Sequence, residues 1–450
     1  MMPLKIKFSD IAKVWVNAAG RCLPWVLFLL SAAVFAQQPR FSGFLQLDKR
    51  FNVGGDSVTI ADFYNRFRVE LSAPLGNRLY VFSSMDFRFY DLPRVNSLSS
   101  LEDLDSLYPT EISLWEAYAE VYGFLFNDFD LRIGKQRIAW GSADKLNPTD
   151  ILNPDDFSDF INFTEKIPTW AVMGTYYLGE FTLIGVWLPN LVPVLLPRYG
   201  ASLFLGELPG DLSDSLALPA QRPPNSIFAF KLSSRIGRVD YSLSYFKGYD
   251  DIPVSRKTIH NFSNDGSSTV PLDLGFPKMQ AIGVDFATEL FGAGVWGEGA
   301  LFLPEKVISQ TQIGETASSQ TVVLDDAPYF KFTLGGDYTF SEGFYINVQW
   351  MHGFFTERGS DALHDYFFMQ LEKGILKDDV RIAVGGGLEV SDWNSINDTY
   401  GYGIFPELTY RAIDNLEIAM GTFLVDGKTA ALFGSWKNAD QAYIRVKVKF

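Results

Sequence analysis

The chain has 450 residues, of which 47% are hydrophobic and 15% aromatic, and its formal net charge at pH 7 is −15. A soluble chain of this length usually divides into about two or three domains, whereas a large β-barrel stays one domain because every strand needs two neighbours. The acidic balance argues against a nucleic-acid partner, which needs a basic face, and the single cysteine, Cys22, excludes a disulfide framework.

The amino-terminal segment has the layout of a secretory signal peptide. Basic residues precede an apolar run over residues 22–36, and small residues end that run before Gln37. Val34 and Ala36 stand at the −3 and −1 positions of the predicted cleavage site. Because the basic region is long, an uncleaved anchor helix is the alternative. After residue 36, no apolar run reaches the roughly 20 residues that a spanning helix needs. The chain is therefore predicted to be exported, with residues 1–36 as its signal peptide.

From residue 40 onward, apolar and polar residues alternate in segments of about 8 to 12 residues, the period of a strand with two unlike faces. In residues 380–390, for example, Ile382 and Val384 share one face, and Arg381 and Glu389 share the other. About 9 to 11 residues suffice for a tilted strand to cross a bilayer. We predict about 18 strands, with 16 as the second choice. They lie near 40–50, 63–73, 78–90, 112–122, 129–138, 168–178, 181–187, 226–235, 238–246, 279–289, 294–302, 328–339, 344–354, 365–375, 379–390, 401–412, 415–425 and 441–450.

The connections between these segments alternate in length. Short ones, rich in Gly, Asp and Asn as tight turns require, fall near 74–77, 123–128, 179–180, 237, 291–293, 341–343, 376–378 and 413–414. Long ones fall near 51–62, 91–111, 139–167, 188–225, 247–278, 303–327, 355–364, 391–400 and 426–440. Short periplasmic turns opposite long outer loops are typical of bacterial outer-membrane barrels. The predicted fold is an all-β, transmembrane antiparallel β-barrel formed by residues 37–450.

The last strand, residues 441–450, alternates apolar and charged side chains strictly and ends on Phe450. It resembles the closing strand of a bacterial outer-membrane barrel, in which a terminal Phe is a familiar assembly signal. We therefore expect the barrel-assembly machinery to recognise this strand and outer-membrane lipid to surround the barrel. For this stretch alone, an edge strand of a soluble sheet is the alternative.

Charged side chains on the polar face of each strand are predicted to line the lumen, where only charges at a narrow point set selectivity. Loop 139–167 carries two Asn-Pro turns followed by acidic residues, and we expect it to fold onto or into the barrel mouth with one or two short helical turns. Its acids lack the ordered spacing of a calcium loop, so no metal site is predicted. The candidate lumen or constriction residues are Arg66, Arg68, Arg88, Glu116, Glu120, Arg132, Asp144, Asp150, Asp155, Asp156, Lys331, Arg381, Arg445 and Lys447.

Loop 188–225 is unusually apolar for an outer loop. An exposed apolar patch marks an interaction surface, so this loop has two possible roles. It packs against loop 139–167 as a lid or plug, or it lines an entrance for a hydrophobic substrate.

A block of sequence in this region resembles a known family. Residues 132–157 read RIGKQRIAWGSADKLNPTDILNPDDF, and KIPTWA, GVWLP and LLPR follow. This block is similar to a family of porin-like bacterial outer-membrane proteins of unknown function, whose members carry a G-K-Q…W-G…N-P-x-D…N-P-x-D stretch and a following V-W-(I/L)-P. The match covers about 130–200. It implies a large exported barrel, with some relatives encoded beside lipid or hydrophobe transport systems, and it supplies no substrate or functional residues.

The sequence offers little support for catalysis. It has three histidines, His260, His352 and His364, and neither a G-x-S-x-G elbow nor an H-E-x-x-H motif. We predict a non-enzymatic outer-membrane channel, without a cofactor, through which small solutes pass by passive or facilitated diffusion. A transporter of hydrophobic molecules or lipids and a barrel-scaffolded surface adhesin or receptor are the alternatives.

Overall fold

The computed structural model describes residues 39–450 except 56, 62, 91, 96, 145–146, 163, 198–214, 263–267, 270–271 and 314–316. The predicted signal peptide, residues 1–36, lies outside the described residues. Among the described residues, none of the helices has the length and apolar character needed to pass through a bilayer.

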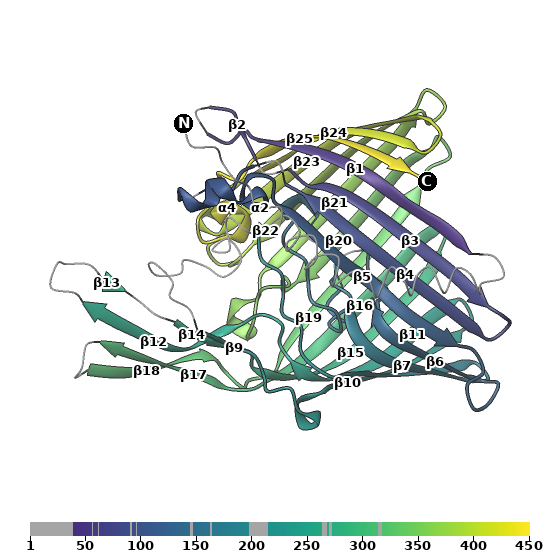
Figure 1. Ribbon diagram of the computed structural model, residues 1–450, viewed down its shortest axis with the longest axis horizontal. Helices are drawn as coiled ribbons and strands as arrows, with labels where there is room; N and C mark the ends of the chain where they lie inside the picture. Colours follow the sequence, from purple (N-terminus) through teal and green to yellow (C-terminus); the bar gives the residue numbers. More distant parts are fainter. Residues whose placement is uncertain are drawn as a thin grey trace, which may run out of the picture.

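Most of the described chain forms one antiparallel sheet that closes on itself (Figure 1). The sheet has 19 strands, of which β2 (Thr59–Ile60) pairs only with the last two residues, Phe51 and Asn52, of β1 (Arg40–Asn52). The other strands form a ring of 18, because β25 (Gln441–Lys449) pairs with β1 and every strand has two neighbours. The predicted count of 18 is thus confirmed, and the second choice of 16 is wrong.

The strands between β1 and β25 match the predicted segments closely, and each pairs with the next strand of the ring. They are β3 (Asn65–Leu75), β4 (Leu79–Phe89), β5 (Thr110–Val121), β6 (Phe129–Gln136), β7 (Thr169–Leu178), β8 (Phe181–Leu188), β10 (Ile227–Ile236), β11 (Val239–Tyr249), β15 (Lys278–Leu290), β16 (Ala293–Pro304), β19 (Tyr329–Thr339), β20 (Phe344–His352), β21 (Asp365–Ile375), β22 (Val380–Val390), β23 (Tyr400–Ile413) and β24 (Leu416–Gly427).

The two ends of the chain complete the ring. Strands β1 and β25 are paired from Phe44↔Lys449 to Asn52↔Gln441. Beyond them, the Phe450 and Gly43 main chains exchange hydrogen bonds of 3.0 and 3.1 Å. A Cβ atom at position 43 would collide with the main chain of β3 and the Phe450 ring, so glycine permits this close approach. A closed ring leaves no sheet edge in the bilayer, where every backbone polar group needs a partner within the protein.

The outer face of the ring is apolar. Ile382, Val384 and Leu388 of β22 are 41–43% exposed, whereas Glu389 is fully buried on the inner face. The same alternation runs through neighbouring strands, for example at Ile282, Val284, Phe330, Leu334, Ile404 and Leu408. Such a belt of outward apolar side chains makes the ring a transmembrane barrel.

Short turns gather at one end of the barrel and long loops at the other (Figure 1). In the turn between β15 and β16, Phe291 and Gly292 have φ angles of 55° and 83°, as a two-residue hairpin turn requires. The last strand also ends at the short-turn end (Figure 1). The long loops hold the short helices η1 (Ser99–Glu102), α2 (Leu104–Leu107), η2 (Phe160–Asn162), η3 (Pro223–Asn225), η4 (Ser360–Ala362), η5 (Ile396–Asp398) and α4 (Leu432–Ser435).

Three of the predicted long links contain strands of a second sheet, which extends away from the long-loop end (Figure 1). This sheet was not predicted, because its central contact is a parallel pairing between loops that lie far apart in the sequence. Its strands are β9 (Ser215–Ala217), β12 (Val254–Phe262), β13 (Ser268–Thr269), β14 (Leu272–Gly275), β17 (Val307–Ile313) and β18 (Ala317–Leu324).

Candidate functional site in the barrel lumen

Basic side chains gather on the inner face of four neighbouring strands, β25, β1, β3 and β4. Strand register sets this arrangement: Arg66 lies opposite Arg88, Arg68 opposite Asp86, and Asp48 opposite Arg445. We call this surface the basic wall; it consists of Arg50, Arg66, Arg68, Arg88, Arg445 and Lys447.

One carboxylate and one aromatic ring hold three of these arginines together. Asp86 is fully buried, and its oxygens lie 2.7 Å from Arg66 Nε, 3.2 Å from Arg68 Nε and 3.4 Å from Arg88 Nε. The three guanidinium carbons lie 4.9–5.2 Å from the centre of the Trp115 ring. The register between β4 and β5 shifts at Ser84/Met85, so Trp115 is the extra residue of a β-bulge. Both contacts offset the repulsion among the arginines.

The carboxyl-terminal half of loop 139–167 docks on this wall through three acids. Arg50 Nη1 and Nη2 donate to the Asp159 carboxylate at 2.7 and 2.9 Å. Arg88 donates to Asp156 at 2.9 Å. Arg66 Nη1 and Nη2 donate to Glu165 at 2.8 and 2.9 Å. Paired, charge-assisted hydrogen bonds of this kind are strong and fix orientation, so they hold the loop inside the lumen.

The electrostatic balance at Asp159 shows how tightly the loop is held. Burial by itself raises the pKa of the Asp159 carboxyl, but the charge and hydrogen bonds of Arg50 outweigh it, and the pKa lies below its usual range. Asp159 is therefore charged at neutral pH, where its pairing with Arg50 stabilises the docked loop.

The amino-terminal half of the loop is anchored differently, on the opposite side of the barrel. Glu298 of β16 is 4% exposed, and its carboxylate accepts hydrogen bonds from the backbone N–H groups of Ser142, Ala143 and Thr149 at 2.7, 3.0 and 3.2 Å. The Thr149 hydroxyl also donates to it, at 3.2 Å. One buried acid thus satisfies several loop donors that would otherwise have no partner.

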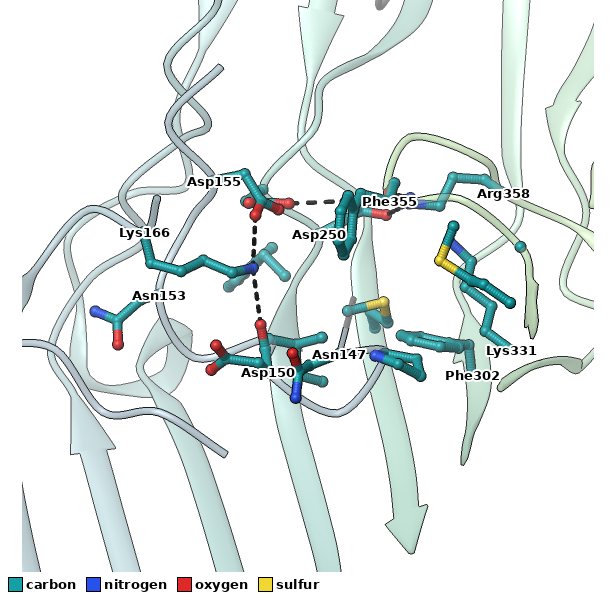
Figure 2. A pocket seen from close by; sticks show the side chains of 17 residues that line it. Asn147, Asp150, Asn153, Asp155, Lys166, Asp250, Phe302, Lys331, Phe355 and Arg358 are labelled. Atoms are coloured by element: carbon teal, nitrogen blue, oxygen red, sulfur yellow. Dashed lines mark hydrogen bonds and ion pairs between the residues drawn. The ribbon is translucent and has the colours of Figure 1, made fainter. Parts of the chain in front are cut away.

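Between these anchors lies a closed polar centre (Figure 2). Lys166 Nζ lies 2.7 Å from the Asp155 carboxylate and donates to the Asp150 carbonyl at 2.9 Å. Across a cavity of only about 50 Å³, Arg358 pairs with Asp250, and Lys331 donates to the Phe354 carbonyl at 2.6 Å. Because almost every charge here has a partner, this centre fixes the loop and leaves little room for a solute.

Larger spaces lie on either side of it. We call the first, of about 240 Å³, the arginine cavity; it is lined by Arg66, Arg68, Arg88 and Lys447 of the basic wall, by the three loop acids, and by Phe44, Gln46, Tyr64, Asn65, Tyr90, Ser158 and Asn162. The second, of about 340 Å³, lies between the loop and Phe355 and is lined by Arg137, Trp140 and Thr164 among others. The inward loop thus narrows the lumen and leaves polar spaces beside it.

The structure separates the predicted lumen residues into groups. It brings Arg66, Arg68, Arg88, Asp156, Arg445 and Lys447 together at the basic wall and Asp150, Asp155 and Lys331 at the closed centre. The others lie apart: Glu120 pairs with Arg132 at 3.0 Å, Glu116 accepts the Arg137 N–H at 2.9 Å, Arg381 lies 3.3–3.4 Å from two acids, and Asp144 contacts Asn347 at 3.3 Å. Their role in solute passage stays a prediction.

The predicted list of constriction residues omitted several residues of this site, among them Arg50, Asp159, Glu165 and Glu298. Arg50 is the last residue of the first predicted strand, and because it is in phase with Asp48 the alternation already places it on the inward face. Glu298 lies on the inward face of its predicted strand and differs in no visible way from other lumen acids. Asp159 and Glu165 carry no local signal, because their partners are about 100 residues away in the sequence.

The described part of loop 188–225 packs against loop 139–167. Leu191 and Val194 are buried, Leu195 N donates to Asp155 O at 3.0 Å, and Phe157 N donates to Leu195 O at 2.8 Å. The predicted packing is thus confirmed for this part. Residues 198–214, which contain much of the predicted hydrophobic entrance, lie outside the described residues.

One further acid-rich cluster fastens a loop to the wall. Ligand atoms of Glu357, His364 and Glu389 lie within 4.8 Å of one another. The Glu389 carboxylate accepts the backbone N–H groups of Leu432 and Phe433 at 2.7 and 2.9 Å, which anchors helix α4 inside the barrel. This cluster therefore has a structural role: its hydrogen bonds hold the loop that contains α4 against the barrel wall.

Comparison with known proteins supports the fold and no closer relationship. No protein-family model and no curated protein matches this sequence. Similar solved structures include OccK8 (OprE) of Pseudomonas aeruginosa, with a TM-score of 0.51 and 10% identity over 92% of this chain and 98% of that one. OpdK of the same organism, in a structure with vanillate, has a TM-score of 0.51 and 10% identity over 92% and 99% of the two chains. OccK9 (OpdG) has a TM-score of 0.51 and 9% identity over 92% and 98%.

The fold is therefore that of a porin-like β-barrel of 18 strands, in agreement with the resemblance noted in the sequence. The absence of enzymatic activity stays a prediction.

Proposed function

We propose that this protein is a channel of the bacterial outer membrane through which small solutes, anions in preference to cations, pass down their gradient. Solutes pass beside the inward loop, and the basic wall selects among them by charge. The observation that carries this proposal is the arginine cavity, a polar space of about 240 Å³ beside a loop that narrows the lumen.

The charges around this cavity favour an anion. Four cations line it, namely Arg66, Arg68, Arg88 and Lys447, against the three loop acids. Asp159 is already engaged by Arg50, which lies behind the cavity wall. In the part of the chain that the structure describes, Lys447 has no carboxylate within ion-pairing distance and lies 4.2 Å from the centre of the Phe44 ring. An entering anion would find a cation without a counter-ion, although the whole chain is acidic.

The apolar belt and the placement of short turns and long loops at opposite ends support an outer-membrane location. Outer-membrane lipid is the expected partner of that belt. We also infer that the assembly machinery recognises the closing strand, β25 with Phe450, because this strand completes the ring against β1.

Single-channel recording in planar bilayers, with a KCl gradient across the membrane, tests the proposal. We expect discrete conductance steps and a reversal potential whose sign shows that chloride crosses more readily than potassium. A potassium-selective current would contradict the predicted charge selectivity. A folded barrel without any conductance would contradict the channel itself and favour a surface scaffold.

A further inference from the structure

The outer edge of Arg66 is shaped to receive a carboxylate. Its Nη1 and Nη2 atoms donate separately to the two oxygens of Glu165, at 2.8 and 2.9 Å. Arg68 Nη2 lies 3.6 Å from Glu165 Oε1. A guanidinium fork holding both oxygens of a carboxylate is a specific arrangement, which a point charge such as lysine does not reproduce.

This fork is held in position independently of Glu165. Asp86 of the same barrel wall engages the Nε atoms of Arg66 and Arg68 at 2.7 and 3.2 Å, and Trp115 lies against both guanidinium groups. The arginines therefore need not rearrange when the group on their outer edge changes. A site held in this way loses little free energy to ordering when a ligand binds.

Glu165 is the loop acid best placed to leave. Its side chain is 20% exposed, compared with 2% for Asp156 and 18% for Asp159, and it faces the arginine cavity. Its partner Arg66 is itself 14% exposed, whereas Asp159 is held by the fully buried Arg50. The loop keeps its other anchors without it: Arg50 with Asp159, Arg88 with Asp156, and Glu298 with three backbone N–H groups. Departure of Glu165 thus opens the fork without releasing the loop.

Exchange avoids the cost that usually accompanies breaking a partly buried ion pair. Removing one partner leaves the other charge without compensation in a region of low dielectric. If a carboxylate from solution takes the place of Glu165, the arginines keep their hydrogen bonds and the freed Glu165 gains water. A carboxylate attached to a flat apolar group would gain further contact with Phe44, Tyr64 and Tyr90, which line the same cavity.

We propose that Arg66 and Arg68 form a binding site for the carboxylate of a small monocarboxylate solute, and that Glu165 fills this site as an internal substitute which the solute displaces. The inference rests on the proposed channel function for its physiological meaning, but the binding site can be tested separately. Competition with an internal carboxylate makes binding weak and reversible, as a channel requires for both entry and release.

Calorimetric titration of the purified full-length barrel in detergent tests the site, with benzoate as the probe and benzyl alcohol as its uncharged counterpart. Glu165→Gln removes the competing charge and keeps the size of the side chain. We expect benzoate to bind this variant about ten-fold more tightly or better than the wild type, with benzyl alcohol unchanged. Glu180→Gln, in the exposed turn between β7 and β8, makes the same change of charge away from the cavity and should bind benzoate like the wild type.

The double variant Arg66→Gln/Glu165→Gln should lose the gain in benzoate affinity, because it lacks the fork. Equal benzoate affinity in Glu165→Gln and the wild type would overturn the proposal, and so would a Glu165→Gln chain that fails to fold, which would make Glu165 a structural residue. Bilayer recording of the same proteins separates the two ideas. Tighter binding in a barrel that does not conduct would support the site and refute the channel, whereas a conducting barrel without tighter binding would do the reverse.

Discussion

The two halves of loop 139–167 reach the barrel wall by different chemistry. Residues 142–149 offer backbone N–H groups to one buried acid, Glu298. Residues 156–165 offer three carboxylates to arginines on the other side of the barrel. In the first half the loop supplies the donors and the wall supplies the charge. In the second half both partners are charged.

The two kinds of anchor differ in whether a solute can replace them. The N–H groups of Ser142, Ala143 and Thr149 converge on the carboxylate of Glu298, which is 4% exposed, so an anion from solution cannot reach this position without moving the loop. On the arginine side, each interaction joins two side chains, and an anion from solution can take the place of one carboxylate at a time. We therefore expect the Glu298 half to be the fixed part and the arginine half to be the exchangeable part. The following experiments test that contrast.

The largest effect should come from Arg50→Met. Arg50 is fully buried and pairs with both Asp48 and Asp159, so its removal leaves Asp159 buried beside an uncharged side chain. We expect a loss of about 3–5 kcal/mol in the free energy of unfolding. Urea titration of the barrel in lipid vesicles measures this change. A loss below about 1 kcal/mol, the range of exposed pairs, would show that the loop does not depend on this anchor.

Glu298→Gln should have a smaller effect confined to the other half of the loop. The amide oxygen still accepts a hydrogen bond, but the second oxygen is replaced by an NH2 group that faces backbone donors. The expected cost is about 1–3 kcal/mol, the range for leaving a buried donor without a partner. Hydrogen exchange should speed up over residues 142–149 and stay unchanged over 156–165. Equal acceleration in both halves would mean that the loop opens as one unit and that the contrast is wrong.

A modest effect of pH is expected at Asp251, in the loop after β11. Burial, together with the neighbouring charges of Asp155 and Asp250, raises the pKa of its carboxyl to about 7. Because the folded-state pKa exceeds the unfolded value, the contribution of Asp251 to stability is fully present below about pH 4 and is lost as the pH rises through about 7. Asp251→Asn should therefore raise the melting temperature more at pH 8 than at pH 5, as measured by circular dichroism. A gain that is equal at both pH values would contradict the raised pKa.

The smallest effect should come from Arg235→Met. Arg235 pairs with Asp240 at 2.6 and 2.8 Å, two hydrogen bonds of about the same length as those of Arg50 with Asp159, but both side chains are more than half exposed beside a short turn. Water solvates both ions when the pair is broken, so we expect no measurable change in the urea midpoint. This variant is the matched control for Arg50→Met, because it loses the same side chain and differs in burial. A large loss here would mean that pair geometry, and not burial, sets the energy.

The strands could be predicted from the sequence because each carries its own signal. Ile382, Val384, Arg381 and Glu389 show the alternation within a few residues, and the membrane demands that the apolar face point outward. The inward loop was predicted only in outline. Its docking on Arg50 and Glu298 depends on which wall residues lie across the lumen, and no pattern along the chain records that distance.

The 18 strands, the short turns at one end and the long loops at the other are written in the local pattern of the chain, because strand period and turn composition are local properties. Which charges pair inside the barrel depends instead on the three-dimensional fold. Closing the ring brings β25 beside β1, and folding the loop inward brings Glu165 to Arg66 across about 100 residues of sequence. Charges in the lumen pair because they lie close together in space, and they come close together only after the barrel has closed.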